Sequence, residues 1–430
     1  MSQEPIEQLV YTGPGTAGGE LLRRYWQPIA LSREVKSGEP LPLKIMNEDL
    51  VLFRNERGEL GLLGHNCAHR GMDLSFGRVE DGGLRCIYHG WLFAPDGRCL
   101  EAPAEPEGST LYKRIRQPGY PCQEVANIVF AYMGPGEPPM LPPLEIFSVA
   151  PEHRMEIKLL QECNYLQAVE GNLDPAHQSF LHGFRGGREA SAKYQIPNPV
   201  GGTKLSNTAL YAENTRPQID VENTGFGVRA FISRLIPGEG TFLKVYNFVM
   251  PNYAIVTGGA GADGYAINWH VPIDDVSHWK FNFIFNRVNR MDMESMRRVI
   301  IPEMESEFVP KRNKRNRYLQ DRADMKNGWF SGLGPGFVDH DTCATEMQGP
   351  ICDRSRENLG QSDKMLVRGR KIMMDALNDI RNSRDPLGVI RGDTSNWVPE
   401  LRVISEFFAE NRNWKEEWLE VAEKRMVQVE

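Results

Sequence analysis

The sequence has few cysteines, no long apolar run and no excess of positive charge. Seven cysteines in 430 residues are sparse, and their odd number argues against a disulfide scaffold. No apolar stretch approaches the roughly 20 residues that a membrane helix needs, and the start MSQEPIEQLVYTG lacks the basic segment of a secretory signal. Fifty basic against 57 acidic side chains leave a formal charge of −7, which disfavours a general polyanion binder. We therefore expect a cytoplasmic protein without nucleic-acid or membrane partners.

The chain is expected to fold into more than one domain. At about 150 residues per domain, its length predicts two or three. The clearest boundary is the stretch 135–151, where six prolines in 17 residues predict an extended linker. Before it, residues 41–134 contain short alternating segments separated by turn dipeptides such as Arg57-Gly58, which predict a small all-β domain. Residues 1–40 would form a helical arm that precedes this domain.

Residues 152–430 predict a second, larger domain. Alternating apolar residues over 241–288 favour an antiparallel sheet. Helical periodicity over 292–308 and 363–380 predicts helices that flank it. The fold class is therefore α+β, with an all-β domain followed by a domain of sheet and helices.

The small domain contains two short sequences that each carry one cysteine and one histidine. They are Cys67-Ala68-His69 and, 16 residues later, Cys86-Ile87-Tyr88-His89. Two thiolates and two imidazoles are the ligands of a Rieske [2Fe–2S] centre, in which one iron takes the cysteines and the other the histidines. A structural zinc site also accepts two Cys and two His. Zinc sites usually pair the two cysteines closely, however, so the pattern favours the iron–sulfur cluster.

A second candidate metal site follows the linker. Asp174-x₂-His177-x₄-His182 offers two imidazoles, to which a distant carboxylate would add the third ligand of a facial triad for Fe(II). On an ideal helix the two histidines would lie roughly 140° apart. They can converge only if the helix unwinds or ends, which Pro175 and Gly183 permit. A histidine pair alone is more often a surface or core feature than a metal site.

Together these sequences resemble the Rieske non-haem iron oxygenases. NCAHRG and CIYHGWLF are similar to the cluster loops of that family, and D-x₂-H-x₄-H matches its iron-binding pattern. The resemblance extends over EGNLDPAH, MQGPICDRSRENLGQSD and the N-terminal GPGT…RRYWQP, and together these segments resemble the phthalate dioxygenase branch. The start also matches GxGxxG, but the cluster domain begins where a nucleotide-binding βαβ unit would have to continue.

The resemblance implies a role for each site residue. His177 and His182 would bind the mononuclear iron, and Asp174 would link them to the cluster ligand His89 of a neighbouring subunit. The family's D-x₄-E-x-Q-like segment implies that Asp341 is the third iron ligand. Asp339 and Asp353 are the alternatives that the same stretch offers, and all three carboxylates could instead be solvated at a helix start.

The resemblance also implies an activity. The chain would be the terminal oxygenase of a system that draws electrons from an NAD(P)H-dependent reductase, directly or through a ferredoxin. With O₂ it would cis-dihydroxylate an aromatic carboxylate of the phthalate or benzoate type, as a homo-oligomer and commonly a trimer. An alternative is O-demethylation of a methoxylated or ether-linked aromatic acid. A remote alternative is an electron-transfer protein without oxygenase activity.

One substrate contact is predicted from the residues themselves. In VRAFISRLI, alternation places Arg234 on an apolar strand face, where an unpaired charge is costly. A substrate carboxylate held bidentately is one natural partner. Lys244 lies on a similar face of the next alternating segment. An internal salt bridge or a side chain that reaches the solvent would explain either cation equally well.

Overall fold

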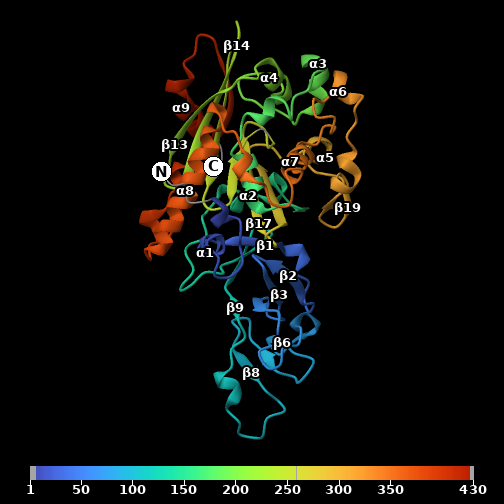
Figure 1. Ribbon diagram of the computed structural model, residues 1–430, viewed down its shortest axis with the longest axis vertical. Coiled ribbons are helices and arrows are strands. Elements are labelled where there is room, and N and C mark those ends of the chain that lie inside the picture. The colour runs from blue at the N-terminus through green and yellow to red at the C-terminus, as the bar shows by residue number, and fades with distance from the viewer. Residues whose placement is uncertain (1–5, 258, 427–430) are drawn as a thin grey trace. The chain divides into compact units, whose positions relative to one another are not determined.

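The computed structural model describes residues 6–257 and 259–426, and the chain forms two compact units (Figure 1). The smaller comprises Glu7–Leu141 with Val271–Asp275, and the larger is built mainly from Pro142–His270 and the chain from Val276 onward. The division between residues 141 and 142 lies inside the predicted proline-rich linker. Sheets in both units, with helices concentrated in the larger, confirm the α+β class.

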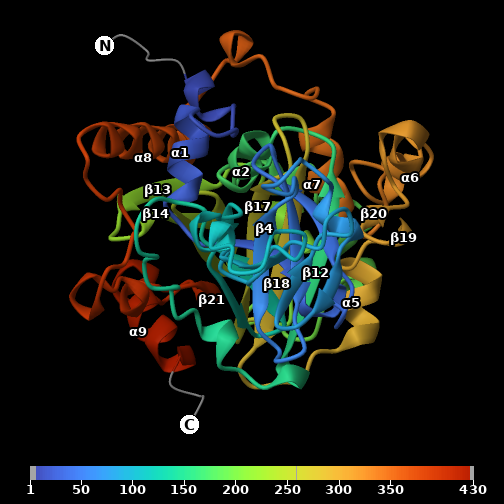
Figure 2. The ribbon, with the colours of Figure 1, turned by 90° about the horizontal axis from the view of Figure 1, so that it is seen from below.

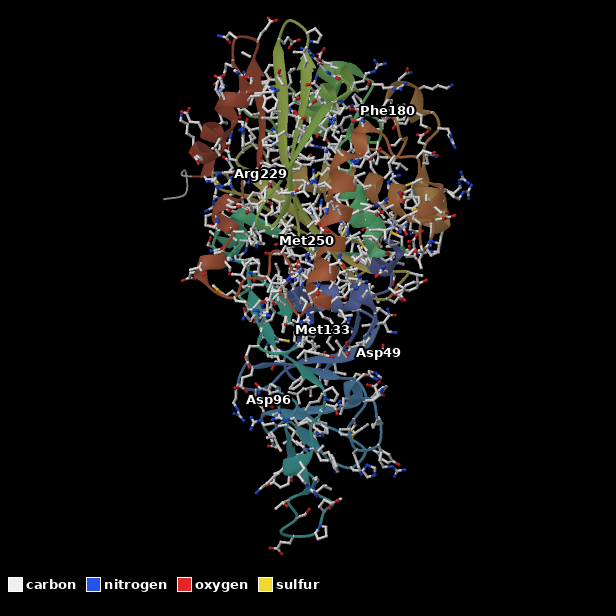
Figure 3. The ribbon with its side chains drawn as sticks, turned by 60° about the vertical axis from the view of Figure 1, so that its left-hand side comes forward. Asp49, Asp96, Met133, Phe180, Arg229 and Met250 are labelled. Carbon is white, nitrogen blue, oxygen red and sulfur yellow. The ribbon has the colours of Figure 1, made fainter. Side chains whose placement is uncertain are left out.

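The small unit consists mainly of short antiparallel strands (Figure 3). Two four-stranded sheets follow the orders β2-β3-β4-β9 and β5-β6-β7-β8, and a three-stranded sheet follows β1-β11-β10. The first strand of the predicted N-terminal arm, β1, thus pairs with the last strand of the unit. The strands are β1 Gln27–Leu31, β2 Leu41–Ile45, β3 Glu48–Arg54, β4 Leu60–Gly64, β5 Arg78–Glu80, β6 Gly83–Arg85, β7 Leu92–Phe93, β8 Cys99–Glu101, β9 Gly119–Tyr120, β10 Cys122–Val125 and β11 Ile128–Ala131.

The glycine-rich start of the chain forms no nucleotide-binding unit. Thr16 caps the short helix α1 (Ala17–Arg23) by accepting a hydrogen bond from the Gly19 N–H. The next element, β1, pairs antiparallel with β11. A βαβ unit would require a parallel pair, so the match to GxGxxG does not reflect dinucleotide binding.

An eight-stranded antiparallel sheet forms the centre of the large unit. Its order is β12-β18-β17-β16-β15-β14-β13, and β21 pairs with the first half of β15. From β13 to β18 consecutive strands are neighbours, because each turns back on the one before. The strands are β12 Arg154–Gln161, β13 Gln218–Asn223, β14 Gly227–Ile236, β15 Gly240–Val249, β16 Tyr253–Val256, β17 Gly264–Pro272, β18 His278–Asn286 and β21 Ile404–Ala409.

Helices and a small hairpin surround this sheet (Figures 1 and 2). The longest, α8, lies along β13 and β14, and α9 lies beside β21. None of the helices in the described ranges is long and apolar enough to cross a membrane. The elements are α2 Tyr165–Asn172, α3 Gly187–Ser191, α4 Asn207–Glu213, α5 Met293–Val299, α6 Asp324–Asn327, α7 Phe337–Glu346, α8 Lys364–Arg381, α9 Trp414–Met426, β19 Met304–Ser306 and β20 Val309–Pro310.

The helix predicted over 292–308 is too long. Asp292 caps its start as expected, but α5 ends at Val299. Pro302 disfavours helical backbone at the residue before it, and the run Val299-Ile300-Ile301 is β-branched. The rest of the predicted helix forms the hairpin of β19 and β20 instead.

Helix α8 confirms the second helical prediction and supports the segment that follows α2. Its buried residues recur at helical spacing and include Met365, Ile372, Met373 and Ala376. Gly369 allows a close approach, because a Cβ there would lie 2.8 Å from the Leu173 side chain. Leu173 directly precedes Asp174, so this contact fixes the entry to the candidate iron site.

Candidate functional site

Two loops of the small unit carry the residues predicted to hold a [2Fe–2S] cluster. Cys67 and His69 lie between β4 and β5, and Cys86 and His89 lie between β6 and β7. The same two hydrogen bonds close each loop. The cysteine N–H donates to the carbonyl of the residue five positions later, and the N–H of the glycine four positions later, Gly71 or Gly90, donates to the cysteine carbonyl. These glycines have φ of 73° and 74°, a region that favours glycine. The two sequences thus build matching loops.

The four side chains lie close enough to share a cluster. The His69 and His89 rings are 4.5 Å apart, and His69 stacks on Trp91. Cys67 and Cys86 are buried, and this burial raises the pKa of the Cys67 thiol to about 11. His69 Nδ1 is also buried and has no hydrogen-bond partner within the described part of the chain. Desolvated thiols beside an unpaired imidazole nitrogen fit ligation of iron, which stabilises the thiolates.

Gln117 supports the first cluster loop. Its Oε1 accepts a hydrogen bond of 2.7 Å from the Ala68 N–H. Its Nε2 donates to the carbonyls of Gly64 and Asn66, at 2.7 and 2.9 Å. A single buried amide therefore holds three points of the loop. No sequence pattern singles it out, because its role depends on a contact across some 50 residues.

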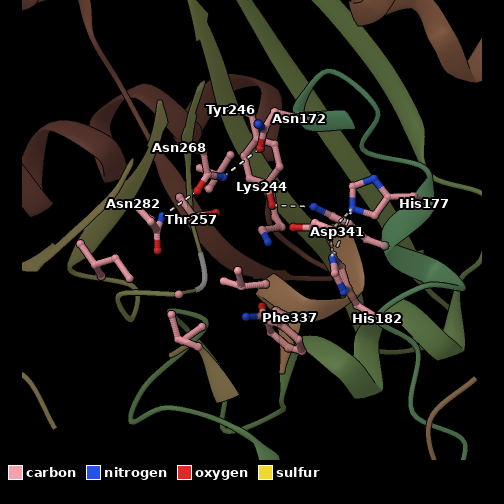
Figure 4. A pocket seen from close by; sticks show the side chains of 18 of the residues that line it. Asn172, His177, His182, Lys244, Tyr246, Thr257, Asn268, Asn282, Phe337 and Asp341 are labelled. Carbon is pink, nitrogen blue, oxygen red and sulfur yellow. Dashed lines mark hydrogen bonds and ion pairs between the residues drawn. The ribbon is translucent and has the colours of Figure 1, made fainter. Parts of the chain in front are cut away.

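The three predicted ligands of a mononuclear iron meet in the large unit. His177 and His182 follow α2, and Asp341 lies on α7. Their nearest ligand atoms all lie within 4.8 Å of one another. His182 Nε2 is 3.2 Å from His177 Nε2 and 3.0 Å from Asp341 Oδ1. Figure 4 shows the three side chains pointing toward a common centre.

The chain turns between α2 and these histidines, as their spacing requires. Helix α2 ends at Asn172, and His177 opens a separate 3-10 turn. Asp174 Oδ1 caps that turn by accepting from the N–H groups of Ala176 and His177, at 2.9 and 3.3 Å. The other oxygen, Oδ2, lies 3.9 Å from His177 Nδ1. Asp174 therefore holds the backbone at His177 and places its second carboxylate oxygen near the ring.

His340 fixes the tautomer of His182, although no sequence pattern distinguishes it from other histidines. Its Nε2 lies 2.8 Å from the Gly334 carbonyl, which can only accept, and burial lowers its pKa to about 3. His340 Nδ1 is therefore unprotonated, and His182 Nδ1, 3.0 Å away, must donate to it. His182 Nε2 then presents a lone pair toward the carboxylate oxygen of Asp341. Two acceptors that face each other without a proton fit a bound cation such as Fe(II).

The protonation states of the ligands also suit a metal. Burial alone would raise the pKa of Asp341, but the adjacent His182, Lys280 and His177 hold it far below its ordinary value. Burial lowers the pKa of His182, and the attraction of Asp341 only partly opposes this. An ionised carboxylate and neutral imidazoles are the forms that bind a divalent cation.

The alternative carboxylates lie elsewhere. Asp339 is on the same helix, but its side chain faces Arg312, with an Oδ2 to Nε distance of 3.8 Å. Asp353 is exposed and caps a turn by accepting from the Ser355 N–H. Of the three candidates, Asp341 alone belongs to the histidine cluster.

Glu170 anchors α2. It is buried, and its carboxylate bonds to Arg354 at 2.8 Å and to Arg370 at 2.7 Å. Arg370 lies on α8 and also pairs with Glu357. This network ties the helix before the iron ligands to two downstream segments.

A cavity opens beside the iron ligands (Figure 4). Its empty space is about 740 Å³, the mouth included. One wall is the face of the large sheet, and the other is formed by α4, α7 and the segment after α2. The polar residues that line it are Asn172, Asp174, His177, Gln178, His182, Asn207, Tyr211, Lys244, Tyr246, Thr257, Asn268, Lys280, Asn282 and Asp341.

Two buried lysines point from the sheet toward this cavity. Lys244 on β15 donates a hydrogen bond to the Tyr211 hydroxyl and lies over the Tyr246 ring. Lys280 on β18 lines the cavity close to Asp341. Burial lowers the pKa of both, that of Lys244 strongly. Within the described ranges neither pairs with a carboxylate at salt-bridge distance, so the cavity is a favourable place for an anion.

Arg234 lies outside the cavity lining. It is fully buried, and its guanidinium points to the turn that carries His177, 3.4 Å from the Pro175 carbonyl and 3.3 Å from Ser179 Oγ. It also lies 5.0 Å from the Tyr211 ring. These contacts support the metal-binding turn and one cavity wall. The predicted contact between Arg234 and a substrate carboxylate stays a prediction.

Two family descriptions match most of the chain. Residues 25–121 match the Rieske [2Fe-2S] domain, and residues 131–428 match the domain described as "LigXa C-terminal domain like". The chain belongs to the Rieske non-haem iron oxygenases. As a terminal oxygenase subunit, it carries a [2Fe–2S] cluster and a mononuclear iron, for which the two ligand sets above provide the fit.

Curated relatives of this oxygenase are subunits of the same kind. It is 34% identical to the phthalate 4,5-dioxygenase oxygenase subunit of Pseudomonas putida, over 86% of this chain and 84% of the relative. It is 32% identical to the 5,5'-dehydrodivanillate O-demethylase oxygenase subunit of a Sphingobium species, over 94% and 87%. The family therefore includes both dioxygenases and O-demethylases.

Solved structures share the fold of this oxygenase. The oxygenase of a carbazole 1,9a-dioxygenase complex with ferredoxin matches with a TM-score of 0.55 at 19% identity, over 91% of this chain and 95% of that chain. Dicamba monooxygenase bound to dicamba matches with a TM-score of 0.56 at 18% identity, over 85% and 100%.

Proposed function

We propose that this oxygenase acts on an aromatic acid whose carboxylate binds at the buried lysines of the cavity. The observation that carries the proposal is that Lys244 and Lys280 line the same cavity as the predicted iron ligands, and that within the described residues neither lies at salt-bridge distance from a carboxylate. A substrate carboxylate would supply the missing charge and hydrogen-bond acceptor. It would also orient the aromatic ring, because the bound carboxylate and the reacting ring carbon belong to the same rigid molecule.

The proposed reaction is cis-dihydroxylation, in which O₂, two electrons and two protons add two hydroxyl groups to adjacent ring carbons. Iron held by His177, His182 and Asp341 would supply the activation of O₂. The residues of the chain bind the ring, exclude bulk water and hold the ligands in their required protonation states. O-demethylation is the second candidate, because the relative that aligns over 94% of this chain is an O-demethylase subunit.

Electrons would come from an NAD(P)H-dependent reductase, directly or through a ferredoxin. A cytoplasmic location stays a prediction from the composition of the sequence, and a homotrimer stays a prediction from the family resemblance. In that arrangement the cluster of one subunit would donate electrons to the iron site of its neighbour. Asp174 would lie between His177 of its own subunit and His89 of the partner subunit.

The first test is mass spectrometry of turnover products. Iron-loaded protein, NADH, a surrogate reductase and a panel of phthalates, benzoates and methoxybenzoates are combined in air. We expect a product that gains two oxygens and two hydrogens, while loss of a methylene with release of formaldehyde would establish O-demethylation. No product from any acid, with an intact cluster spectrum, would refute the proposed substrate class.

Lys280→Met is expected to raise KM for the accepted acid roughly 10- to 100-fold, because a charged hydrogen bond is lost.

The second test addresses Asp174. Asp174→Asn keeps an oxygen that can cap the His177 turn but removes the negative charge. We expect both metals to stay bound while electron transfer between them slows by at least about 10-fold. Stopped-flow absorbance would follow reoxidation of a pre-reduced cluster in the presence of substrate and O₂. A rate equal to that of the wild type would remove Asp174 from the electron path.

A further inference from the structure

A continuous chain of side-chain hydrogen bonds connects the cavity wall to a backbone carbonyl behind it. It passes through three amides and two imidazoles, which are buried or half-buried. The contacts are Asn282 Nδ2 to Asn268 Oδ1 (2.6 Å), Asn268 Nδ2 to Asn172 Oδ1 (2.8 Å), Asn172 Nδ2 to His270 Nε2 (2.6 Å), His270 Nδ1 to His278 Nε2 (3.0 Å) and His278 Nδ1 to the Cys163 carbonyl (2.8 Å).

The carbonyl at the far end sets the direction of every hydrogen bond. Because the Cys163 oxygen can only accept, His278 Nδ1 carries the proton. Burial lowers the pKa of His278 to about 4, so the ring is neutral and its Nε2 is an acceptor. His270 Nδ1 must therefore donate to it. Gln161 Oε1 lies 2.7 Å from this Nε2, and Gln161 Nε2 lies 2.9 Å from the Thr342 hydroxyl. An unprotonated His278 Nε2 requires the opposite orientation of this amide, in which its N–H donates to His278 and its oxygen accepts from the Thr342 hydroxyl.

The same logic continues to the cavity. His270 Nε2 accepts from the Asn172 amide N–H, so the oxygen of Asn172 accepts from Asn268. The oxygen of Asn268 then accepts from Asn282. Asn282 uses its Nδ2 for a second bond as well, to the Ile267 carbonyl at 3.3 Å.

Within the described residues, the side-chain oxygen of Asn282 is thereby left without a hydrogen-bond partner. Both N–H bonds of Asn282 point away from the cavity, and Figure 4 shows its oxygen on the opposite side from Asn268. Rotation of the amide would bring the oxygens of Asn282 and Asn268 face to face without a proton between them and would turn an oxygen toward the Ile267 carbonyl, which is costly in a buried site. Asn282 Oδ1 is therefore a fixed acceptor on the cavity wall.

We infer that Asn282 selects aromatic acids that carry a hydroxyl group, or another hydrogen-bond donor, on the ring. This inference rests on the proposed function and extends it. Asn282 and Lys280 lie two residues apart on β18 and both line the cavity, so one strand presents a cation and an acceptor side by side. A ring hydroxyl donates to the acceptor, whereas a hydrogen or methoxy group at that position leaves a buried oxygen without a partner.

The test compares pairs of aromatic acids that differ only by hydroxyl against hydrogen or methoxy at one ring position. Binding to the iron-loaded oxygenase is measured anaerobically by calorimetry, and kcat/KM is measured with O₂. We expect the wild type to favour the hydroxylated member of one pair by about 10- to 100-fold. Asn282→Leu is expected to lose that preference and to bind the other member at least as well.

Asn286→Leu is the matched control. Asn286 is a buried amide on the same strand that bonds to the Ala260 carbonyl and does not line the cavity. This variant should keep the preference for the hydroxylated acid. Iron content, cluster spectrum and melting temperature report whether each variant is folded.

Distinct outcomes separate this inference from the proposed function. Acids that bind without any hydroxyl preference in the wild type, or a preference that survives Asn282→Leu, would overturn the role of Asn282 alone. Phenols that lack a carboxylate but bind in an Asn282-dependent way would support that role and contradict the carboxylate site. Failure of every aromatic acid and phenol to bind the folded wild type would overturn both.

Discussion

Replacing Asp341 with alanine is expected to leave the oxygenase with its [2Fe–2S] cluster but without the mononuclear iron. The two histidines alone lack the ionised carboxylate that the site uses to balance the charge of Fe(II). Purified Asp341→Ala should contain about two iron atoms per chain where the wild type has about three. Product formation should fall by at least about 10³-fold, since the metal supplies several kcal/mol of the barrier reduction.

Asp353→Ala and Asp339→Asn are the controls for that experiment, because the sequence offered both carboxylates as alternative ligands. Asp353 is exposed and caps a turn, and Asp339 faces Arg312. Both variants should keep the third iron. Visible absorbance and electron paramagnetic resonance of the reduced cluster verify that the small unit is intact. A full complement of iron in Asp341→Ala, or its loss in Asp353→Ala, would contradict the assignment.

The candidate ligands of both metals could be selected from the sequence because most of them lie in short motifs. The two Cys–His sequences predict an iron–sulfur cluster, and His177 and His182 lie within one short segment. Asp341 required the family resemblance, because more than 150 residues separate it from the histidines and only the packing of α7 against α2 brings them together. Asp339 lies two residues earlier on the same helix, and sequence spacing alone does not show which of the two carboxylates faces the histidines.

The supporting residues could not be predicted, because each acts through a contact between distant strands or loops. Gln117 touches a loop about 50 residues upstream, and Lys280 and Asn282 face the cavity only because β18 lies next to β12 and β17 in the sheet. Arg234 illustrates the opposite difficulty. Alternation identified a cation on a buried strand face, but only the structure shows that its guanidinium turns to the backbone of Pro175.

His340→Leu is expected to weaken binding of the mononuclear iron by about 10- to 100-fold without removing a ligand. In the wild type, the acceptor Nδ1 of His340 keeps the proton of His182 on its Nδ1 and leaves Nε2 free for the metal. Leucine fills a similar space but offers no acceptor, so the His182 proton can move to Nε2, where it competes with iron. The apparent Kd for Fe(II), measured by titration of the iron-free site, reports the change.

His340→Gln distinguishes this positioning role from a simple loss of packing. A glutamine amide can accept from His182 and donate to the Gly334 carbonyl, so it should recover part of the iron affinity that leucine loses. Cobalt(II) bound at the same site provides a spectroscopic readout, since a change in the His182 donor alters its visible absorption bands. Equal iron affinity in His340→Leu and the wild type would show that the metal itself sets the tautomer of His182. Equal losses in the leucine and glutamine variants would show that His340 acts through packing and not as an acceptor.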